Sequence, residues 1–318
     1  MHKYIIKRLL LSLLIVVLVS VFAFSLMHFL DGDPVTMVLG EGVSQETIQQ
    51  YRAELNLDKP ILEQYWLWIK GIVTQGNFGT SILYREDVGR LMWTRLPVSL
   101  SIVIPTLIIS VALGIFWGVI SAITRGTWID QLITFFANLG VGMPIFWVAV
   151  LGIYTFAVKL QILPIQGYTA PDKNFAAFVE RATLPVFCLT LGFIATLIRQ
   201  TRSNMLETIN QDYIRTARAN GLPEHRIIFV HALKNALIPI ITVIGVRVCT
   251  IIGSTVVIER MFNIPGLGSL MIRAIDNRDY MIVQGCVLIL SVITVTTNLL
   301  VDIAYGLVDP RIRIAGRK

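Results

Sequence analysis

Six long apolar runs alternate with polar segments along this chain, and they predict membrane-spanning helices. The runs are Leu9–Leu30, Val98–Ile123, Leu132–Val158, Leu184–Ile198, Leu237–Ile258 and Ile282–Tyr305. The first would form roughly 33 Å of helix at about 1.5 Å per residue, which is enough to cross a bilayer. Because no small-residue cleavage site follows it, we expect a retained span with its N-terminus inside rather than a signal peptide.

Prolines, glycines and run length refine this picture. Pro105 is expected to be tolerated inside the second span, where neighbouring helices can satisfy freed backbone groups. The stretch Gly140–Pro144 predicts a kink near the first third of the third span. Segment 159–181 is interpreted as an external loop, and the short run Leu184–Ile198 is expected to extend by a turn at its cytoplasmic end.

The polar segment 31–96 places apolar residues at helical spacing and predicts a small external domain. Its aromatic residues Tyr65, Trp66 and Trp68 could lie at the headgroup level or form the core of this domain, and we favour the core. The predicted division is a first span at 1–30, this domain at 31–96, a five-helix core at 97–305 containing a cytoplasmic loop at 199–236, and a cytoplasmic tail at 306–318.

Composition supports a membrane protein without chemistry of its own. The chain has 318 residues, 55% hydrophobic and 15% charged, whereas soluble domains have about a quarter charged. Lys and Arg are denser in the segments that lie inside if both termini are cytoplasmic, so the net charge of +7 reflects topology rather than nucleic-acid binding. The motifs GxxxxGK[ST], HExxH and GxSxG are absent, and the three cysteines lie in apolar runs. We expect no catalytic residue, metal or cofactor.

One basic island, Asp212–Pro239, interrupts the apolar runs, and it predicts a helix, a tight turn and a second helix. Gly221 is placed to end the first helix, and Pro223 suits the first turn of the second. A nucleic-acid reader would show a similar pattern, but this island must lie within a few residues of the bilayer. The alternatives are a solvated connection or a docking element for a soluble partner. We favour docking, on a surface of small residues that includes Ala217 and Ala219.

Polar residues inside the spans are the other candidate site. Arg247 lies at the centre of the fifth span, where a cation costs on the order of 3 kcal/mol, so it should face protein or water. We interpret it as part of a translocation pathway, with an ion pair to Asp302 or to a partner subunit as the competing explanation. Glu259, just outside this span, needs no special role. The pathway candidates on two helical faces are Arg247, Thr250 and Ser254, and Ser291, Thr294 and Asn298. Interhelical hydrogen bonding explains the hydroxyl residues equally well.

At this point the sequence resembles a known family. The island DYIRTARANGL resembles the coupling loop of the membrane-spanning subunits of bacterial ABC importers, in the variant of the peptide and nickel permeases. The further matching stretches are IIKRLL, LNLDKPI, GNFGTS at 76–81, LPVSL at 96–100, GMPIFW at 142–147, LPIQGY at 163–168, HALKNALIP, VIERMFNIPGLG at 257–268, NRDY at 277–280 and DPRIR at 309–313. Arg215 stands where the family has a glutamate, Asn263-Ile264 replaces a frequent aromatic, and Arg247 replaces a neutral residue.

The resemblance implies an all-α membrane protein, with six transmembrane helices forming a type I ABC importer (MetI-like) permease core and a small N-terminal external domain. It implies a bacterial inner-membrane location, a second homologous permease subunit in a heterodimer, two ATPase subunits that carry ATP and Mg²⁺, and an extracytoplasmic binding protein. Lipid is a partner and nucleic acid is not. The residues expected to couple to the ATPases are Tyr213, Arg215, Thr216, Ala217, Arg218, Ala219 and Gly221. Ala217 and Gly221 would provide a close fit, with Arg215 and Arg218 as polar contacts.

The cargo expected from the resemblance is a di- or oligopeptide, with nickel, another metal chelate or a small solute as the alternative. Two other classes remain open on the residues alone. An ion-coupled secondary transporter would need intramembrane carboxylates, which the spans lack apart from Asp302 near one end. A membrane-anchored receptor or assembly factor would use segment 31–96 as its working part.

Overall fold

The structure is a computed structural model that describes residues 2–29, 35–36, 43–54 and 56–308. Helices make up nearly all of the described chain, and one isolated bridge joins Thr80 to Asp87. The helices are α1 His2–Phe29, α3 Gln45–Glu54, α4 Ile61–Gln75, α5 Val88–Ile123, α6 Trp128–Gly142, α7 Ile145–Gly152, α8 Phe175–Ile209, α9 Asp212–Ala219, α10 Glu224–Arg226, α11 Leu233–Met261, α12 Leu267–Asp276 and α13 Tyr280–Val308. Two π-helical turns, η1 Ile153–Lys159 and η2 Ile227–Ala232, continue α7 and α10.

The apolar runs correspond to long helices. Among the described residues, five helices are long and apolar enough to cross a membrane, and there are up to six if the bent pair α6 and α7 counts as one span. This agrees with the six spans expected from the sequence. The predicted tail at 306–318 lies almost wholly outside the described residues.

Two helices begin well before the apolar runs that predicted them. Helix α5 begins at Val88 rather than Val98, because the Asp87 side chain accepts a hydrogen bond from the Arg90 amide at 2.7 Å and caps it. Helix α8 begins at Phe175, inside the expected external loop, where Asn174 caps it through the Ala177 amide at 3.1 Å. It continues to Ile209, much more than one turn past its apolar run. Hydropathy marks the lipid-facing part of a helix, whereas caps mark its ends.

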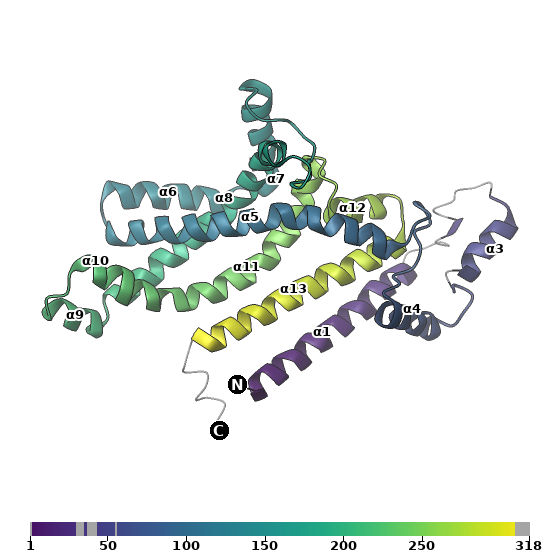
Figure 1. Cartoon of the computed structure of the whole chain (residues 1–318), viewed down its shortest axis with the longest axis horizontal. Helices are drawn as coiled ribbons and strands as arrows, with labels where there is room; N and C mark the ends of the chain where they lie inside the picture. Colours follow the sequence, from purple (N-terminus) through teal and green to yellow (C-terminus); the bar gives the residue numbers. More distant parts are fainter. Residues whose placement is uncertain (1, 30–34, 37–42, 55, 309–318) are drawn as a thin grey trace.

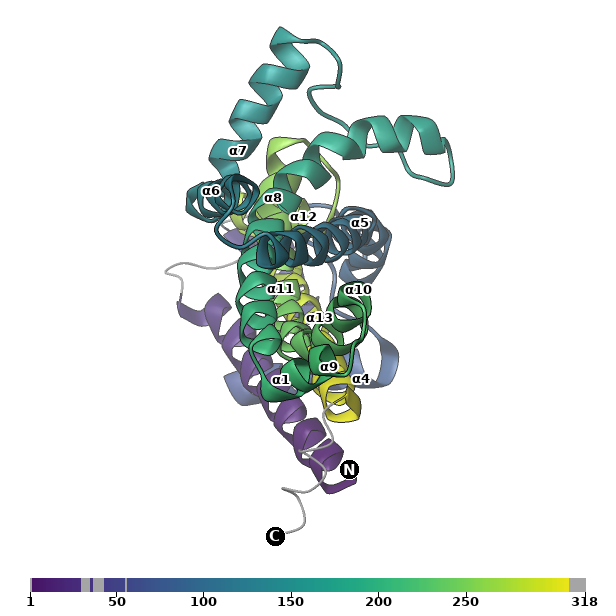
Figure 2. The same cartoon turned by 90° about the vertical axis from the view of Figure 1, so that its left-hand side faces the viewer.

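The predicted kink at Gly140–Pro144 is a break. Helices α6 and α7 are bent by 106° where only Met143 and Pro144 separate them. Proline has no amide hydrogen, and it forces the residue before it out of the helical region, as the extended backbone of Met143 shows (φ −85°, ψ 124°). Figure 2 shows α7 projecting from the bundle.

Helix α8 is the most buried span, and α5 packs against it closely. A Cβ on Gly114 would lie 2.5 Å from the Leu197 Cβ, and one on Gly118 would lie 2.5 Å from the Thr201 Cβ. These two glycines, four residues apart, let the backbones approach as small residues do in membrane helix pairs. Pairing α5 with α8 therefore depends on an absence of side chains at both positions.

The two ends of the bundle differ. In Figure 1, α9 and α10 lie at one end, at the left of the view, whereas α3 and α4 lie at the other, at the right. The helical periodicity expected in segment 31–96 is present as α3 and α4. Tyr65 and Trp68 pack against Phe24 of α1, with ring centroids 5.4 and 6.0 Å away, while Trp66 is exposed. The aromatic core favoured above therefore consists of two residues rather than three.

Candidate functional site

The basic island forms the predicted helical elbow. Helix α9 ends at Ala219, and Gly221 follows it with φ +75°, a conformation that favours glycine. The Gly221 amide donates to the Arg218 carbonyl at 2.9 Å and the Leu222 amide to the Ala217 carbonyl at 3.3 Å. The helix-ending role of Gly221 is confirmed. Pro223 lies just before α10, one position ahead of its expected place.

The inner face of the elbow is anchored to the rest of the chain. Ile214 is fully buried and Ala217 is 9% exposed, and both belong to an apolar cluster with Val119 of α5, Met205 of α8 and Ile227. This corrects the expectation that Ala217 contributes to an outward surface of small residues. Because α9 is packed on the ends of α5 and α8, a force on the elbow is transmitted to both helices.

The outer face of the elbow is exposed and polar. A Cβ added to Gly221 would meet no atom within 4 Å, so the turn borders open space. The remaining exposed residues of the predicted coupling set are Tyr213, Arg215, Thr216, Arg218 and Ala219. The structure thus places six of the seven predicted residues on one accessible surface.

Three side-chain interactions brace this surface. The Arg218 guanidinium donates to both carboxylate oxygens of Glu224, at 2.6 and 3.2 Å, across the turn. This hydrogen bonding raises the pKa of Arg218, so its charge is retained. The Asn235 amide donates to the Tyr213 hydroxyl at 2.9 Å, which ties α9 to the start of α11. Arg218 therefore stiffens the elbow in addition to presenting charge.

Arg247, Thr250 and Ser254 line one cavity of about 200 Å³. They come from α11, and the opposite walls come from the break between α6 and α7 and from α8. The shared helical face expected for these three residues is therefore present. The cavity lies where the interrupted span leaves room in the bundle.

The polar residues of α13 lie elsewhere. Ser291 donates to the carbonyl of Val287 at 2.7 Å, a bond within its own helix and not the interhelical bond that the sequence left open, and neither Ser291 nor Thr294 lines the Arg247 cavity. Asn298 accepts from the Cys249 thiol at 3.4 Å and borders a separate cavity of about 380 Å³. The two polar stripes therefore do not border one cavity in this chain.

The competing ion pair between Arg247 and Asp302 is not formed. Asp302 instead lies 2.8 Å from Arg8, which joins the end of α13 to the start of α1. This pairing follows from the packing of α1 along α13, seen side by side in both views (Figures 1 and 2).

Glu259 was assigned no role from the sequence, and the structure corrects this. Its carboxylate is 1% exposed and accepts hydrogen bonds from the Ser99 hydroxyl at 2.6 Å and the Ser269 amide at 2.9 Å. A Cβ on Gly266 would collide with that carboxylate, and one on Gly268 would collide with Val256 and lie 3.0 Å from the carboxylate. The glycines of the sequence PGLG therefore make room for an acid from another helix, which caps α12.

Two further buried carboxylates, Asp130 and Asp279, were not recognised from the sequence. Asp130 is 5% exposed, and its carboxylate accepts hydrogen bonds from Nε and Nη2 of Arg202 at 2.7 and 2.9 Å, from the Ser121 hydroxyl at 2.6 Å and from the Gly126 amide at 3.0 Å. Asp279 is fully buried and holds the 76–87 segment through Ser81 at 2.5 Å. Arg202 lies 72 residues from Asp130 and Ser81 lies 198 residues from Asp279, so no local sequence pattern indicated either contact.

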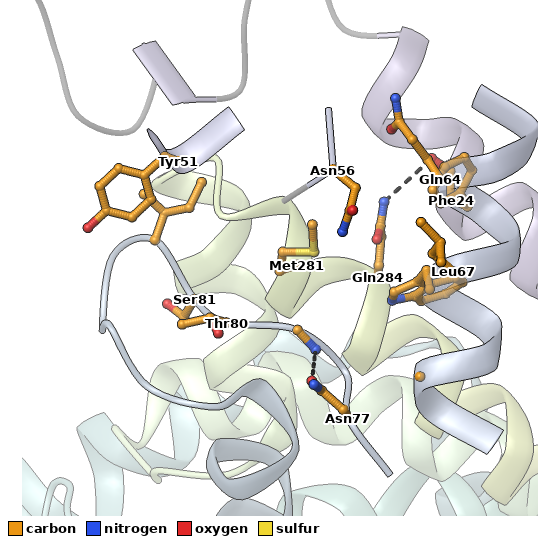
Figure 3. Close-up of a pocket in the computed structure, with 14 residues that line it drawn as sticks. Phe24, Tyr51, Asn56, Gln64, Leu67, Asn77, Thr80, Ser81, Met281 and Gln284 are labelled. Atoms are coloured by element: carbon orange, nitrogen blue, oxygen red, sulfur yellow. Dashed lines mark hydrogen bonds between the residues drawn. The ribbon is translucent and has the colours of Figure 1, made fainter. Parts of the chain in front are cut away.

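A pocket of about 210 Å³ lies at the opposite end from the elbow (Figure 3). Tyr51, Asn56 and Gln64 approach it from the α3–α4 region, and Met281 and Gln284 approach it from α13. None of the described residues that line it is charged. Within the described part of the chain, no group of three or more His, Cys, Asp or Glu side chains is arranged to hold a metal ion.

A bundle of long apolar helices, with an anchored elbow at one end and a cavity at an interrupted span, is the architecture of a membrane-spanning transport subunit. The chain belongs to the family described as binding-protein-dependent transport system inner membrane component, whose model matches residues 114–314. The N-terminal model of the same systems matches residues 1–103. The chain is therefore a multi-pass inner-membrane permease component with an importer fold.

Individual relatives agree with this assignment. The "Probable peptide ABC transporter permease protein y4tP" of Sinorhizobium fredii is 38% identical over 98% of this chain and 100% of its own length. The oligopeptide transport system permease protein AppB of Bacillus subtilis is 38% identical over 98% of this chain and 99% of its own. A solved structure of the MetNI methionine ABC transporter, inward facing, covers 69% of this chain and 97% of its own, with a TM-score of 0.54 and 16% identity. At that identity the likeness concerns the fold alone.

Proposed function

We propose that this chain is one of two membrane-spanning subunits of an ATP-driven importer of di- and oligopeptides. Family membership supports an importer, and the peptide cargo is supported by the names of relatives that match 98% of the chain. A second homologous permease would complete the path, and an extracytoplasmic binding protein would deliver the cargo. A metal chelate is the alternative cargo, and no observation on the described residues favours it.

The exposed and anchored elbow carries the ATPase part of this proposal. Its outer face presents Tyr213, Arg215 and Ala219 around an open turn, while its inner face is buried against α5 and α8. A surface that is accessible outside and rigidly attached inside suits the transmission of force from a separate subunit. We infer that two ATPase subunits, which bind ATP and Mg²⁺, dock on this elbow and its counterpart in the second permease.

The coupling follows from the packing. Closure of the ATPase pair would displace α9, and the buried contacts of Ile214 and Ala217 would carry that displacement into the ends of α5 and α8. Packed helices move as rigid bodies between discrete arrangements rather than deforming continuously. The elbow and both termini would then lie on the cytoplasmic side, and segment 43–87 on the external side. The chain itself contributes movement and a path, with no catalytic residue and no cofactor of its own.

Ala219→Trp tests the docking surface. Residue 219 is exposed at the end of α9 and has ordinary helical backbone, so the bulky ring leaves the fold intact and blocks only what docks there. We expect the variant to insert normally, to co-purify with at least about tenfold less ATPase subunit, and to lose ATP-dependent uptake.

Val73→Trp is the matched control, because Val73 is 77% exposed on α4 at the other end of the molecule. It should co-purify with a normal amount of ATPase. If Ala219→Trp retains the ATPase as well as Val73→Trp does, the elbow is not the docking site.

A further inference from the structure

Arg247 is a cation on the wall of a cavity. In the described part of the chain, its guanidinium has no hydrogen-bond or ion-pair partner, although it lies in the middle of α11. An arginine in a membrane span normally pairs with an acid or a backbone carbonyl. A guanidinium left without one, facing a cavity, is available to an anion that is not part of this chain.

The walls of the cavity also favour an anion. Thr196, Thr250 and Ser254 line it, and no Asp or Glu among the described residues does. The Thr196 hydroxyl already donates to the Gly192 carbonyl at 3.3 Å, which leaves those of Thr250 and Ser254 for a ligand. Ile145, the first residue of α7, lines it too. The first amides of a helix have no acceptor within the helix and carry partial positive charge. Pro144, which precedes α7, provides no side-chain cap for them.

We propose that this cavity receives the carboxylate of the transported peptide, with Arg247 as its charged partner and the Thr250 and Ser254 hydroxyls as neighbouring donors. This inference rests on the peptide importer proposed above. The C-terminal carboxylate is the group we assign, because every linear peptide carries it whatever its side chains. Arg247 makes the cavity selective for negative charge at the place where the third span is broken between α6 and α7.

Uptake by the complete transporter, reconstituted with its binding protein, tests the assignment. The cargoes are tri-alanine, tri-alanine amide and the amide of Ala-Glu-Ala, each supplied with saturating binding protein. Arg247→Gln should lower tri-alanine uptake by about tenfold or more, the factor expected for loss of a charge-assisted hydrogen bond, and leave tri-alanine amide uptake within about twofold. Arg247→Lys should restore most of the tri-alanine uptake.

The three cargoes separate the possible sources of the carboxylate. An equal fall for tri-alanine and its amide would overturn the proposal and make Arg247 a structural residue. A fall only for the Ala-Glu-Ala amide would overturn the C-terminal assignment in favour of an acidic side chain. Absence of any ATP-dependent peptide uptake by the wild-type complex would instead refute the peptide importer.

A second measurement does not depend on transport. In the assembled complex, with this chain's three native cysteines replaced by alanine, Thr250→Cys places a thiol beside Arg247. The measured quantity is the rate at which an anionic sulfonate methanethiosulfonate modifies that thiol, divided by the rate for a cationic ammonium methanethiosulfonate. This ratio should be about tenfold higher with Arg247 present than in the Arg247→Gln variant. An unchanged ratio would mean that a carboxylate of the second permease already neutralises Arg247, and the proposal would fail.

Discussion

The Asp130–Arg202 pair offers a stability test that follows directly from the packing. The pair joins the start of α6 to α8 near the elbow, and the Asp130 side chain is 7% exposed against 29% for Arg202. This asymmetry means that removing one partner does not cost the same as removing the other. Arg202→Met leaves a buried carboxylate without its cation, whereas Asp130→Asn leaves a cation that can reach water.

The magnitudes follow from the contacts. Arg202→Met removes two charge-assisted hydrogen bonds, at 2.7 and 2.9 Å, and retains those from Ser121 and the Gly126 amide. Breaking a buried pair in this way costs about 3–5 kcal/mol. Asp130→Asn keeps a side chain of the same shape that still accepts one hydrogen bond, so we expect a loss of about 1–3 kcal/mol.

Arg199→Met is the matched control. Arg199 lies on the same helix, is exposed, and makes no hydrogen bond or ion pair with the residues that the structure describes. Unfolding of the purified chain in mixed micelles, followed by circular dichroism as the fraction of dodecyl sulfate rises, gives the free energy of unfolding of each variant. The reasoning is refuted if Arg202→Met lies within about 1 kcal/mol of Arg199→Met, or if Asp130→Asn costs more than Arg202→Met.

Two further predictions concern the buried acids missed from the sequence. Gly266→Ala should lower the free energy of unfolding by about 1–3 kcal/mol, because its Cβ overlaps the Glu259 carboxylate, whereas Gly253→Ala, which meets no atom within 4 Å, should be harmless in the same titration. Asp279→Ala should release segment 76–87 and raise its amide hydrogen exchange by at least about tenfold, because its buried acceptor is lost. Asp276→Ala, which removes only an exposed ion pair, should leave that exchange unchanged; equal protection in both variants would contradict the anchoring role.

The elbow shows how much of the site was present in the sequence and where the interpretation went wrong. Gly221 was recognised correctly, because only a few residue types suit a left-handed turn after a helix. The inward direction of Ala217 was also encoded: Ile214 lies three residues earlier, and positions i and i+3 share a helical face, so the apolar side chain marks the buried side. The small size of Ala217 was interpreted as a docking feature when it is a packing feature.

Other features depend on contacts between distant segments and could not be derived from local patterns. The position of Pro144 predicted a bend in the third span, but its size, 106°, depends on how α7 packs against α8 and α11. Glu259 resembled an ordinary charge at a membrane edge because its partners, Ser99 and the start of α12, become neighbours only in the folded chain. Hydropathy likewise indicated the spans and omitted the capped ends of α5 and α8.

Helix α8 links the elbow to the cavity, and this connection gives the two proposals one mechanical basis. Met205 is buried in the elbow cluster, and Thr196 of the same helix lines the cavity beside Arg247. Nine residues separate them, about 14 Å of helix at about 1.5 Å per residue. No proline interrupts α8 between these positions, since its one internal proline is Pro185. A shift imposed on the elbow therefore reaches the cavity wall through a continuous helix, against which the broken span α6–α7 also packs.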